Sequence, residues 1–301
     1  MIISASYRTD IPAFYGDWFL RRVAAGAARF RNPFGGAMVE VSLRPEHVDG
    51  IVFWTRNFGP LMDHLAPIQN RNWPFIIQYT LTGYPRILEP SVIDEETATA
   101  QVRALADKFG KRVVVWRYDP IVITDYTDEQ WHRQTFGRLA RCLQSCVDEV
   151  VVSFVEPYRK TRRNLNRMTA ATGVVWRQLP DDKKLALLRN LAPIAAENGM
   201  TLTLCAQPGL VRAPRTRADS TERHNRPARC IDVYRLSDVA GRPITAKQKG
   251  NRPGCLCAQS RDIGVYDTCP HGCVYCYAVQ DRERAKAAFS RHDPSSLTLA
   301  S

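Results

Sequence analysis

The sequence predicts an α/β protein in which a parallel sheet curls into a complete or partial (β/α) barrel. Eight short runs rich in β-branched and aromatic residues recur along the chain, and stretches with the first and last residues typical of helices lie between them. Because strand and helix alternate, parallel pairing through crossover helices is the economical architecture. A sheet with this many strands is expected to curl.

Each predicted strand is an apolar run closed by polar or turn residues. In chain order these runs are residues 2–6, 38–42, 51–55, 75–80, 112–117, 149–154, 201–205 and 263–266. Too few residues separate the second run from the third for a crossover helix, so we expect one of them in a hairpin insertion.

The predicted helices carry recognisable ends. Residues 91–108 end before Gly110, residues 127–146 begin with a capping box of Thr127 and Gln130, and residues 181–198 end before Gly199. Residues 277–290 read as a further helix because Ala, Arg and Glu are frequent. Residues 208–254 are rich in Gly, Pro and Arg with weak apolar periodicity, so we expect a basic loop insertion without a helix.

Composition limits the class of protein. The chain has 301 residues, 45% of them apolar, which suffices for a globular domain over residues 1–301. Without a long apolar run or a signal-peptide pattern, we expect a soluble cytoplasmic protein with no membrane partner. The formal net charge of +12 fits a nucleic-acid partner and fits equally an arginine-rich genome.

The cysteines are the most informative residues. Nine of them in a chain without an export signal argue against disulfides, because the cytosol keeps thiols reduced. Five fall between residues 255 and 276, and such crowding is typical of metal ligation. Cys269, Cys273 and Cys276 have the spacing C-x3-C-x2-C, which allows three thiolates to bind a cubane [4Fe–4S] cluster and leave one iron open.

The stretch from Cys269 to Cys276 resembles the C-x3-C-x-aromatic-C signature of the radical S-adenosylmethionine superfamily. The resemblance implies that the three cysteines hold a [4Fe–4S] cluster within residues 255–290, and that the open iron binds the amino and carboxylate groups of S-adenosylmethionine. The reduced cluster then cleaves the sulfonium to a 5′-deoxyadenosyl radical. The resemblance further implies that Tyr275 lies beside the adenine and that a flavodoxin or ferredoxin donates electrons.

The position of the motif departs from that superfamily, which places it after the first barrel strand near the N-terminus. Here it lies close to the C-terminal end, so the resemblance implies a circularly permuted barrel with residues 2–6 as the second strand. The end of the second strand holds the methionine amino group in the superfamily, which makes Ser4, Ser6 and Arg8 candidate cofactor contacts. The chain also resembles a bacterial family of unsettled substrate that has the motif at this end, through RTDIP, FWTRN and RYDP at residues 8–12, 53–57 and 117–120.

Two further metal interpretations remain open at this stage. Zinc is the alternative for the main motif, although zinc sites favour paired C-x2-C knuckles. Four other cysteines are candidates for a second [4Fe–4S] cluster or a zinc site if they meet at the same barrel face, and ordinary thiols are an equally open interpretation: Cys205, Cys230, Cys255 and Cys257. Cys142 and Cys146, four residues apart on one predicted helix, are interpreted as packing residues.

Polar residues stand at the carboxyl ends of the predicted strands, where the active sites of such barrels lie. They are Ser6, Arg8, Asp10, Thr55, Arg56, Asn57, Gln78, Thr80, Arg117, Asp119, Ser153, Glu156, Cys205 and Gln207. Each alone fits a loop or a helix cap, but together they predict a polar pocket. His271 is expected to be a polar neighbour of the cluster rather than a ligand.

Two basic segments leave this predicted face. One is residues 158–163, and the other has Arg or Lys at 212, 215, 217, 223, 226, 229, 235, 242, 247, 249 and 252. They predict phosphate contacts with DNA or RNA, or else solvated surface loops. The predicted function is a radical S-adenosylmethionine enzyme, with nucleic-acid modification or repair as the favoured class. The alternative is a non-catalytic iron–sulfur or zinc protein that binds nucleic acid.

Overall fold

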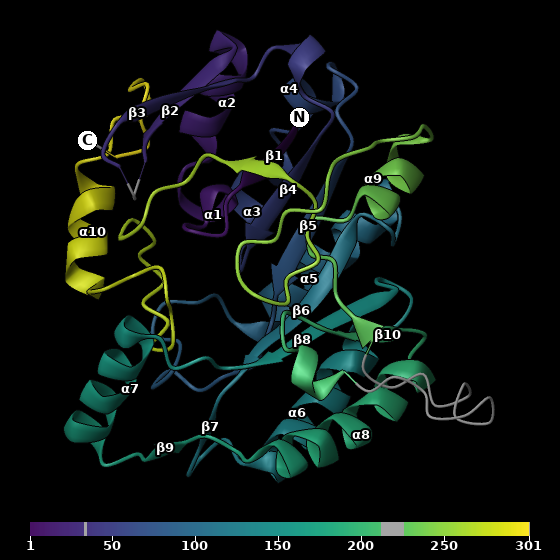
Figure 1. Ribbon diagram of the computed structural model, residues 1–301, viewed down its shortest axis with the longest axis vertical. Helices are drawn as coiled ribbons and strands as arrows, with labels where there is room; N and C mark the ends of the chain where they lie inside the picture. The colour runs from purple at the N-terminus through teal and green to yellow at the C-terminus, as the bar shows by residue number, and fades with distance from the viewer. Residues whose placement is uncertain (33–34, 212–225, 301) are drawn as a thin grey trace.

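The computed structural model describes residues 1–32, 35–211 and 226–300. Its central feature is an eight-stranded sheet with the order β11-β10-β8-β6-β5-β4-β1-β12, in which all neighbouring strands are parallel. Figure 1 shows this sheet crossing the molecule, and the predicted α/β class is confirmed. The strands are β1 (Ile2–Ala5), β4 (Gly50–Thr55), β5 (Phe75–Thr80), β6 (Val114–Ile121), β8 (Glu149–Phe154), β10 (Thr201–Leu204), β11 (Arg226–Pro227) and β12 (Ser260–Asp262).

Two short antiparallel pairs accompany the main sheet. β2 (Ala27–Arg31) pairs with β3 (Met38–Ser42), and β7 (Ile123–Thr124) pairs with β9 (Trp176–Arg177). The predicted hairpin insertion is therefore confirmed, with β3 as the strand that leaves the main sheet. Figure 1 places the C-terminus beside this hairpin, where Thr298 forms a bridge with Arg29.

The helices vary from one turn to five. They are α1 (Ile11–Phe14), α2 (Gly16–Ala25), α3 (Gly59–Met62), α4 (Ala66–Gln69), α5 (Glu95–Phe109), α6 (Glu129–Cys142), α7 (Arg159–Thr172), α8 (Asp181–Glu197), α9 (Val233–Ala240) and α10 (Arg282–Ser290), with 3-10 turns at Pro45–His47 and Pro208–Leu210. None of the helices in the described ranges is both long and apolar enough to cross a membrane.

The sheet is open rather than closed. Its edges are β11 and β12, and these two strands do not pair with each other in the part of the chain that the structure describes. A closed barrel is thus not observed, and the fold is consistent with a partial barrel. At the β12 edge, Ile2 of β1 lies opposite Ser260 on one side and Gly50 of β4 on the other. The last strand of the sequence therefore lies beside the first.

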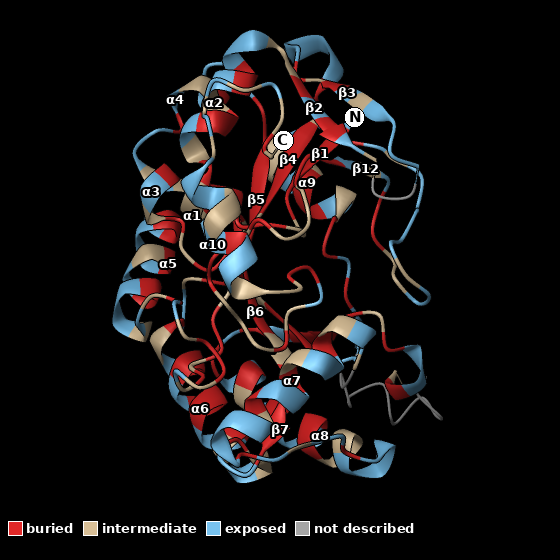
Figure 2. Cartoon of the chain, turned by 90° about the vertical axis from the view of Figure 1, so that its left-hand side faces the viewer, coloured by how far each residue is buried: buried red, intermediate tan, exposed pale blue. Residues whose placement is uncertain are grey.

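Both faces of the sheet are buried, which is usual for parallel strands. Alternate residues such as Ile3, Phe53 and Val114 pack against helices α2, α5, α6 and α8 on the outer face. The residues between them, such as Val52 and Val115, pack against residues 228–258 on the inner face. Figure 2 shows the buried sheet enclosed by elements whose outward sides are exposed. Residues 228–258 thus bury the inner face of the open sheet, which a closed barrel would bury in its interior.

Several predicted element boundaries are corrected by the structure. β12 ends at Asp262 instead of covering residues 263–266, since Gly264 passes so close to Ser6 that a Cβ there would lie 2.1 Å from the serine Oγ. Helix α6 is capped by Asp128, which accepts from Trp131 N at 2.7 Å, and not by Thr127.

The prediction that residues 208–254 contain no helix is wrong. Helix α9 lies within this segment, where Asp232 accepts from Tyr234 N at 2.9 Å and Gly241 ends the helix with a φ of 63°. The helix has only eight residues, which is too short for a clear apolar period. Helix α10 is also shorter than predicted, because its cap is Asp281.

Candidate functional site

The cysteine loop, residues 268–278, lies beyond the carboxyl end of β12. Val274 N donates to the carbonyl of Leu88 at 3.0 Å, and the hydroxyl of Tyr15 donates to the carbonyl of Thr268 at 2.7 Å. These partners follow β5 and β1, respectively, so segments far apart in the sequence hold the loop in place.

The three thiols of the loop are close enough to influence one another. All three are partly exposed to solvent. The pKa of Cys269 is raised well above its usual value, chiefly because burial limits the contact of its thiol with water. The Asp10 carboxylate and the other two thiols raise this pKa further. Restricted access to water raises the pKa of Cys273 to about 12, although the Arg56 guanidinium opposes the shift. Burial also raises the pKa of Cys276.

His271 is paired with a carboxylate rather than with the thiols. Its Nε2 lies 2.9 Å from Oδ2 of Asp10, and both side chains are buried. Asp10 also accepts from Thr55 Oγ1 at 2.7 Å, from Arg56 N at 2.7 Å and from Ala13 N at 3.0 Å. One carboxylate thus connects the cysteine loop, the end of β4 and the start of α1.

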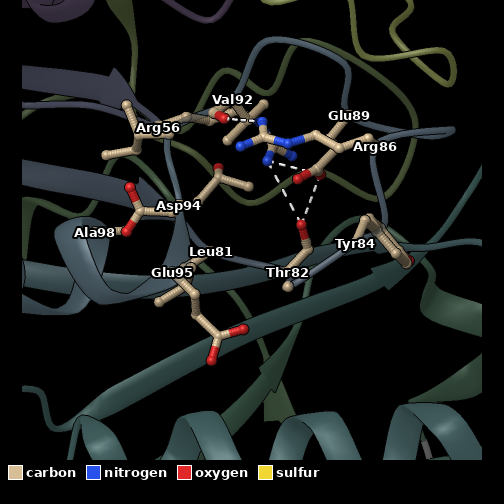
Figure 3. A pocket seen from close by; sticks show the side chains of 13 residues that line it. Arg56, Leu81, Thr82, Tyr84, Arg86, Glu89, Val92, Asp94, Glu95 and Ala98 are labelled. Carbon is tan, nitrogen blue, oxygen red and sulfur yellow. Dashed lines mark hydrogen bonds and ion pairs between the residues drawn. The ribbon is translucent and has the colours of Figure 1, made fainter.

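Tyr275 points into the protein, where its hydroxyl hydrogen-bonds to Arg56 and to Glu89. Arg56 Nη1 lies 2.7 Å from Glu89 Oε1, which also accepts from Thr82 Oγ1 at 2.6 Å. Figure 3 shows Arg56, Thr82 and Glu89 meeting at a cavity of about 120 Å³, which Thr80 and Tyr84 also line. The predicted contact of Tyr275 with adenine stays a prediction.

Asp262, at the end of β12, is a residue whose importance the sequence did not indicate. Its carboxylate accepts from Ser4 Oγ at 2.8 Å and from Ser6 Oγ at 2.6 Å, and also from Gly264 N at 3.0 Å. Arg8 Nε lies 3.8 Å away. Burial raises the pKa of this carboxyl above its usual value, against the opposing effect of Arg8. The predicted residues Ser4, Ser6 and Arg8 are therefore brought together by a carboxylate between the first and last strands.

A second polar network lies on the inner face of the sheet. Arg117 donates from Nη1 to Gln78 Oε1 at 3.1 Å and from Nη2 to Asp119 Oδ2 at 2.6 Å. Asp119 also accepts a hydrogen bond from Ser153. The Arg117 guanidinium lies over the Trp54 ring, 5.1 Å from its centroid. This network brings together four of the predicted strand-end residues.

Other predicted strand-end residues have local structural partners. Gln207 Nε2 donates to Phe154 O and to Glu156 Oε1, both at 3.0 Å. Asn57 Oδ1 accepts from Gln101 Nε2 at 2.8 Å, which ties the end of β4 to α5. These residues stabilise the loops around the strand ends, so the predicted polar pocket is only partly assembled from them.

Four cysteines meet at the far end of the inner face: Cys205, Cys230, Cys255 and Cys257. Cys205 Sγ lies 3.6 Å from Cys230 Sγ, which is far longer than a disulfide bond. Side-chain interactions continue from Cys230 to Cys257 and from Cys257 to Cys255. The four thiols come from β10, from the segment before α9 and from the segment before β12. The four side chains are therefore linked by pairwise interactions, and whether they hold a metal stays a prediction.

Cations and amides surround this group of four thiols. Arg117 Nη1 donates to Cys230 Sγ at 2.9 Å, Arg252 Nη2 donates to Cys205 Sγ at 3.5 Å, and Ile231 N donates to Cys257 Sγ at 3.4 Å. The hydrogen bond from Cys257 lowers the pKa of Cys255 to about 6. The other three thiols have raised pKa values, set by hydrogen bonds among the thiols and by burial: well above the usual value for Cys205, about 12 for Cys230 and about 11 for Cys257. The Arg117 guanidinium opposes the rise at Cys205 and Cys230.

Neither group of cysteines is already arranged around a single point. Within residues 1–32, 35–211 and 226–300, no three His, Cys, Asp or Glu side chains have the arrangement that holds one metal ion. The thiolates of a cubane bind different iron atoms and are spread more widely than the ligands of one ion. The remaining cysteines, Cys142 and Cys146, lie at the end of α6, away from both groups.

The predicted basic segments divide into buried and exposed residues. Arg235 is buried and pairs with Asp148 at 2.8 Å and Glu149 at 2.7 Å, so the prediction that it contacts phosphate is wrong. Positions 212, 215, 217 and 223 lie outside the described residues. The exposed cations are Arg159, Arg162, Arg163, Arg226, Arg229, Arg242, Lys247 and Lys249.

These features define an α/β protein with an open parallel sheet, a cysteine loop beyond the end of β12 and a second group of cysteines on the inner face of the sheet. The chain belongs to the family described as Domain of unknown function (DUF1848), whose model matches residues 2–278. The matched region includes both groups of cysteines. No curated protein and no solved structure matches the chain significantly.

Proposed function

We propose that this protein is a radical S-adenosylmethionine enzyme that holds a [4Fe–4S] cluster on Cys269, Cys273 and Cys276. The observation that carries the proposal is the pairing of β12 with β1, with Ile2 opposite Ser260. The cysteine loop follows an edge strand whose neighbour is β1, which is the relationship that a circular permutation of the superfamily barrel requires. This pairing supports the proposal that the motif near the C-terminal end corresponds to the first loop of the superfamily.

The donor set fits a cubane with one open corner. Three partly exposed thiols belong to this loop, while the other six cysteines form the second group or lie on α6. Three thiolates can bind three different irons of one cubane and leave the fourth iron open. When bound and reduced, such a cluster supplies the electron that cleaves S-adenosylmethionine into methionine and a 5′-deoxyadenosyl radical.

The residues around the loop have separate roles in this proposal. The Asp262 carboxylate, held by Ser4 and Ser6, suits an ammonium group, and Arg8 suits a carboxylate. Arg56 and Glu89 hold Tyr275 by its hydroxyl and thereby set the orientation of the loop. Asp10 orients His271 at the other side.

The substrate class that the surface favours is a polyanion such as DNA or RNA. Arg159, Arg162, Lys247 and Lys249 are exposed and belong to α7 and to the segment that covers the inner face of the sheet. Exposed arginine and lysine side chains bind phosphates without reading the sequence of bases. A ferredoxin or flavodoxin is the proposed electron donor.

The test is anaerobic reconstitution with iron and sulfide, followed by dithionite reduction with S-adenosylmethionine present. We expect release of 5′-deoxyadenosine from the wild type and none from C269A/C273A/C276A. The double variant C142A/C146A is the matched control and should keep the activity. A reconstituted protein that binds iron yet releases no 5′-deoxyadenosine would instead support the non-catalytic iron–sulfur reading.

A further inference from the structure

We infer that Cys205, Cys230, Cys255 and Cys257 form a second metal site that takes a single tetrahedral Zn²⁺ ion. The site is separate from the cysteine loop and does not depend on the proposed catalytic function. It joins three segments that are distant in sequence and close in space: the end of β10, residues 228–232 and residues 255–258.

The spacing of the thiols favours one ion over a cubane. A zinc–sulfur bond of about 2.3 Å in a tetrahedron separates neighbouring sulfurs by about 3.8 Å. Cys205 Sγ and Cys230 Sγ are 3.6 Å apart, close to that separation. In a [4Fe–4S] cluster the cysteine sulfurs bind different irons and stand further apart. The first pair of ligands is therefore already placed for a mononuclear site.

The remaining two thiols, Cys255 and Cys257, belong to the same group of interacting side chains. Cys257 interacts with both Cys230 and Cys255, and Cys255 also interacts with Cys230. Cys255 is only half-buried, which leaves its side chain room to turn toward the others.

The surroundings suit a charged tetrathiolate centre. Four thiolates around Zn²⁺ leave a net negative charge, and a buried charge needs partners. The Arg117 and Arg252 guanidiniums donate to Cys230 and Cys205, at 2.9 and 3.5 Å. Asp119 takes part of the Arg117 charge through its own ion pair at 2.6 Å. Such hydrogen bonds to ligand sulfurs are typical partners of structural metal sites.

The site has a clear structural purpose. The segment 228–258 covers the inner face of the sheet between its two open edges, and the cysteines hold this segment against the end of β10. A metal ion there cross-links the cover to the sheet, which is how structural zinc contributes folding free energy.

The experiment measures zinc and iron in anaerobically purified protein by elemental mass spectrometry. We expect about one zinc per chain in the wild type and in C269A/C273A/C276A, which loses only iron. C255S should lose the zinc, and C146S, the matched control, should keep it. Circular dichroism verifies the fold of each variant, and Cys255 is chosen because it is the only one of the four candidate ligands that is not buried.

A second measurement tests the inference on the wild type, in case C255S does not fold. Wild-type protein produced with cobalt in place of zinc should show the visible absorption bands of tetrahedral cobalt thiolate, and C255S should not. Three outcomes overturn the inference: a wild type without zinc or cobalt, iron in the second group instead of zinc, or zinc that disappears with the C269A/C273A/C276A substitutions. Because none of these readouts uses 5′-deoxyadenosine, failure here is distinguishable from failure of the proposed enzyme activity.

Discussion

Arg117 donates a hydrogen bond to the sulfur of Cys230 across 2.9 Å, inside the protein. The same guanidinium contacts the Trp54 ring, and the Trp54 indole donates to Ser4 Oγ at 3.1 Å. Ser4 in turn donates to Asp262. A continuous row of polar contacts thus crosses the inner face of the sheet, from the end of β12 to the second group of cysteines.

Substitution of Arg117 tests how strongly this network depends on the buried cation. Arg117→Met leaves the Asp119 carboxylate without its ion-pair partner, so the free energy of unfolding should fall by about 3–5 kcal/mol. The double variant R117M/D119N removes the unpaired charge and should recover part of the loss. Urea unfolding of the two variants measures the difference, and equal stabilities would contradict the buried ion pair.

Asp10 should contribute more stability than an ordinary helix cap. Asp10→Ala removes the acceptor for Thr55, Arg56 and His271 and the cap of α1, so we expect a loss of about 3 kcal/mol. Asp94→Ala removes only the exposed cap of α5 and should cost clearly less. Thermal or urea unfolding compares the pair. A D10A variant no less stable than D94A would mean that the Asp10 contacts contribute nothing beyond capping.

His132 should make the protein less stable in mild acid. Burial lowers its pKa to about 4 in the folded chain, so the unfolded chain binds this proton more readily between pH 6.5 and 4. The free energy of unfolding should therefore decrease as the pH falls through this window, by roughly 3 kcal/mol when complete.

The variant His132→Gln tests this pH dependence directly. The variant should have a lower free energy of unfolding than the wild type at pH 7 but should lose less of it on acidification. Urea unfolding at two pH values measures this difference. His64→Gln, at an exposed position, should keep the wild-type pH dependence. Parallel curves for H132Q and the wild type would show that His132 is not the group responsible.

The Tyr275 hydroxyl should affect the stability of the folded protein more than the binding of iron by the cysteine loop. Tyr275→Phe keeps the ring but leaves Arg56 and Glu89 without their hydroxyl partner, so we expect a loss of about 1–2 kcal/mol. Iron content after reconstitution should stay close to that of the wild type. Tyr275→Ala also removes ring packing against Tyr84, and a larger loss of both stability and iron is expected.

Nucleic-acid binding, if it uses the exposed cations of α7, should depend on salt. The variant R159Q/R162Q should reduce the slope of log affinity against log salt by about 1.4 for a single-stranded oligonucleotide. Fluorescence anisotropy at several salt concentrations measures the slope. K108Q/K183Q, exposed on α5 and α8, is the control and should leave it unchanged. An unaltered slope in R159Q/R162Q would place any phosphate contacts elsewhere.

Local features of the molecule could be predicted closely because they depend on neighbouring residues. The predicted strands over residues 75–80 and 149–154 coincide with β5 and β8, whose β-branched runs are buried on both faces. Helix α8 begins at the predicted Asp181. The final strand could not be placed this way, because its end depends on the approach of Gly264 to Ser6, more than 250 residues apart.

By itself, the sequence determined the alternation of strands and helices, the hairpin insertion and the spacing of the three cysteines in the loop. Only the tertiary structure decided that the sheet stays open, that Asp262 binds Ser4 and Ser6, and that Arg117 lies against Cys230. The physical reason is the range of the interactions. Backbone preferences and apolar periodicity act over a few residues, whereas these contacts join residues more than a hundred positions apart and exist only once the chain has packed.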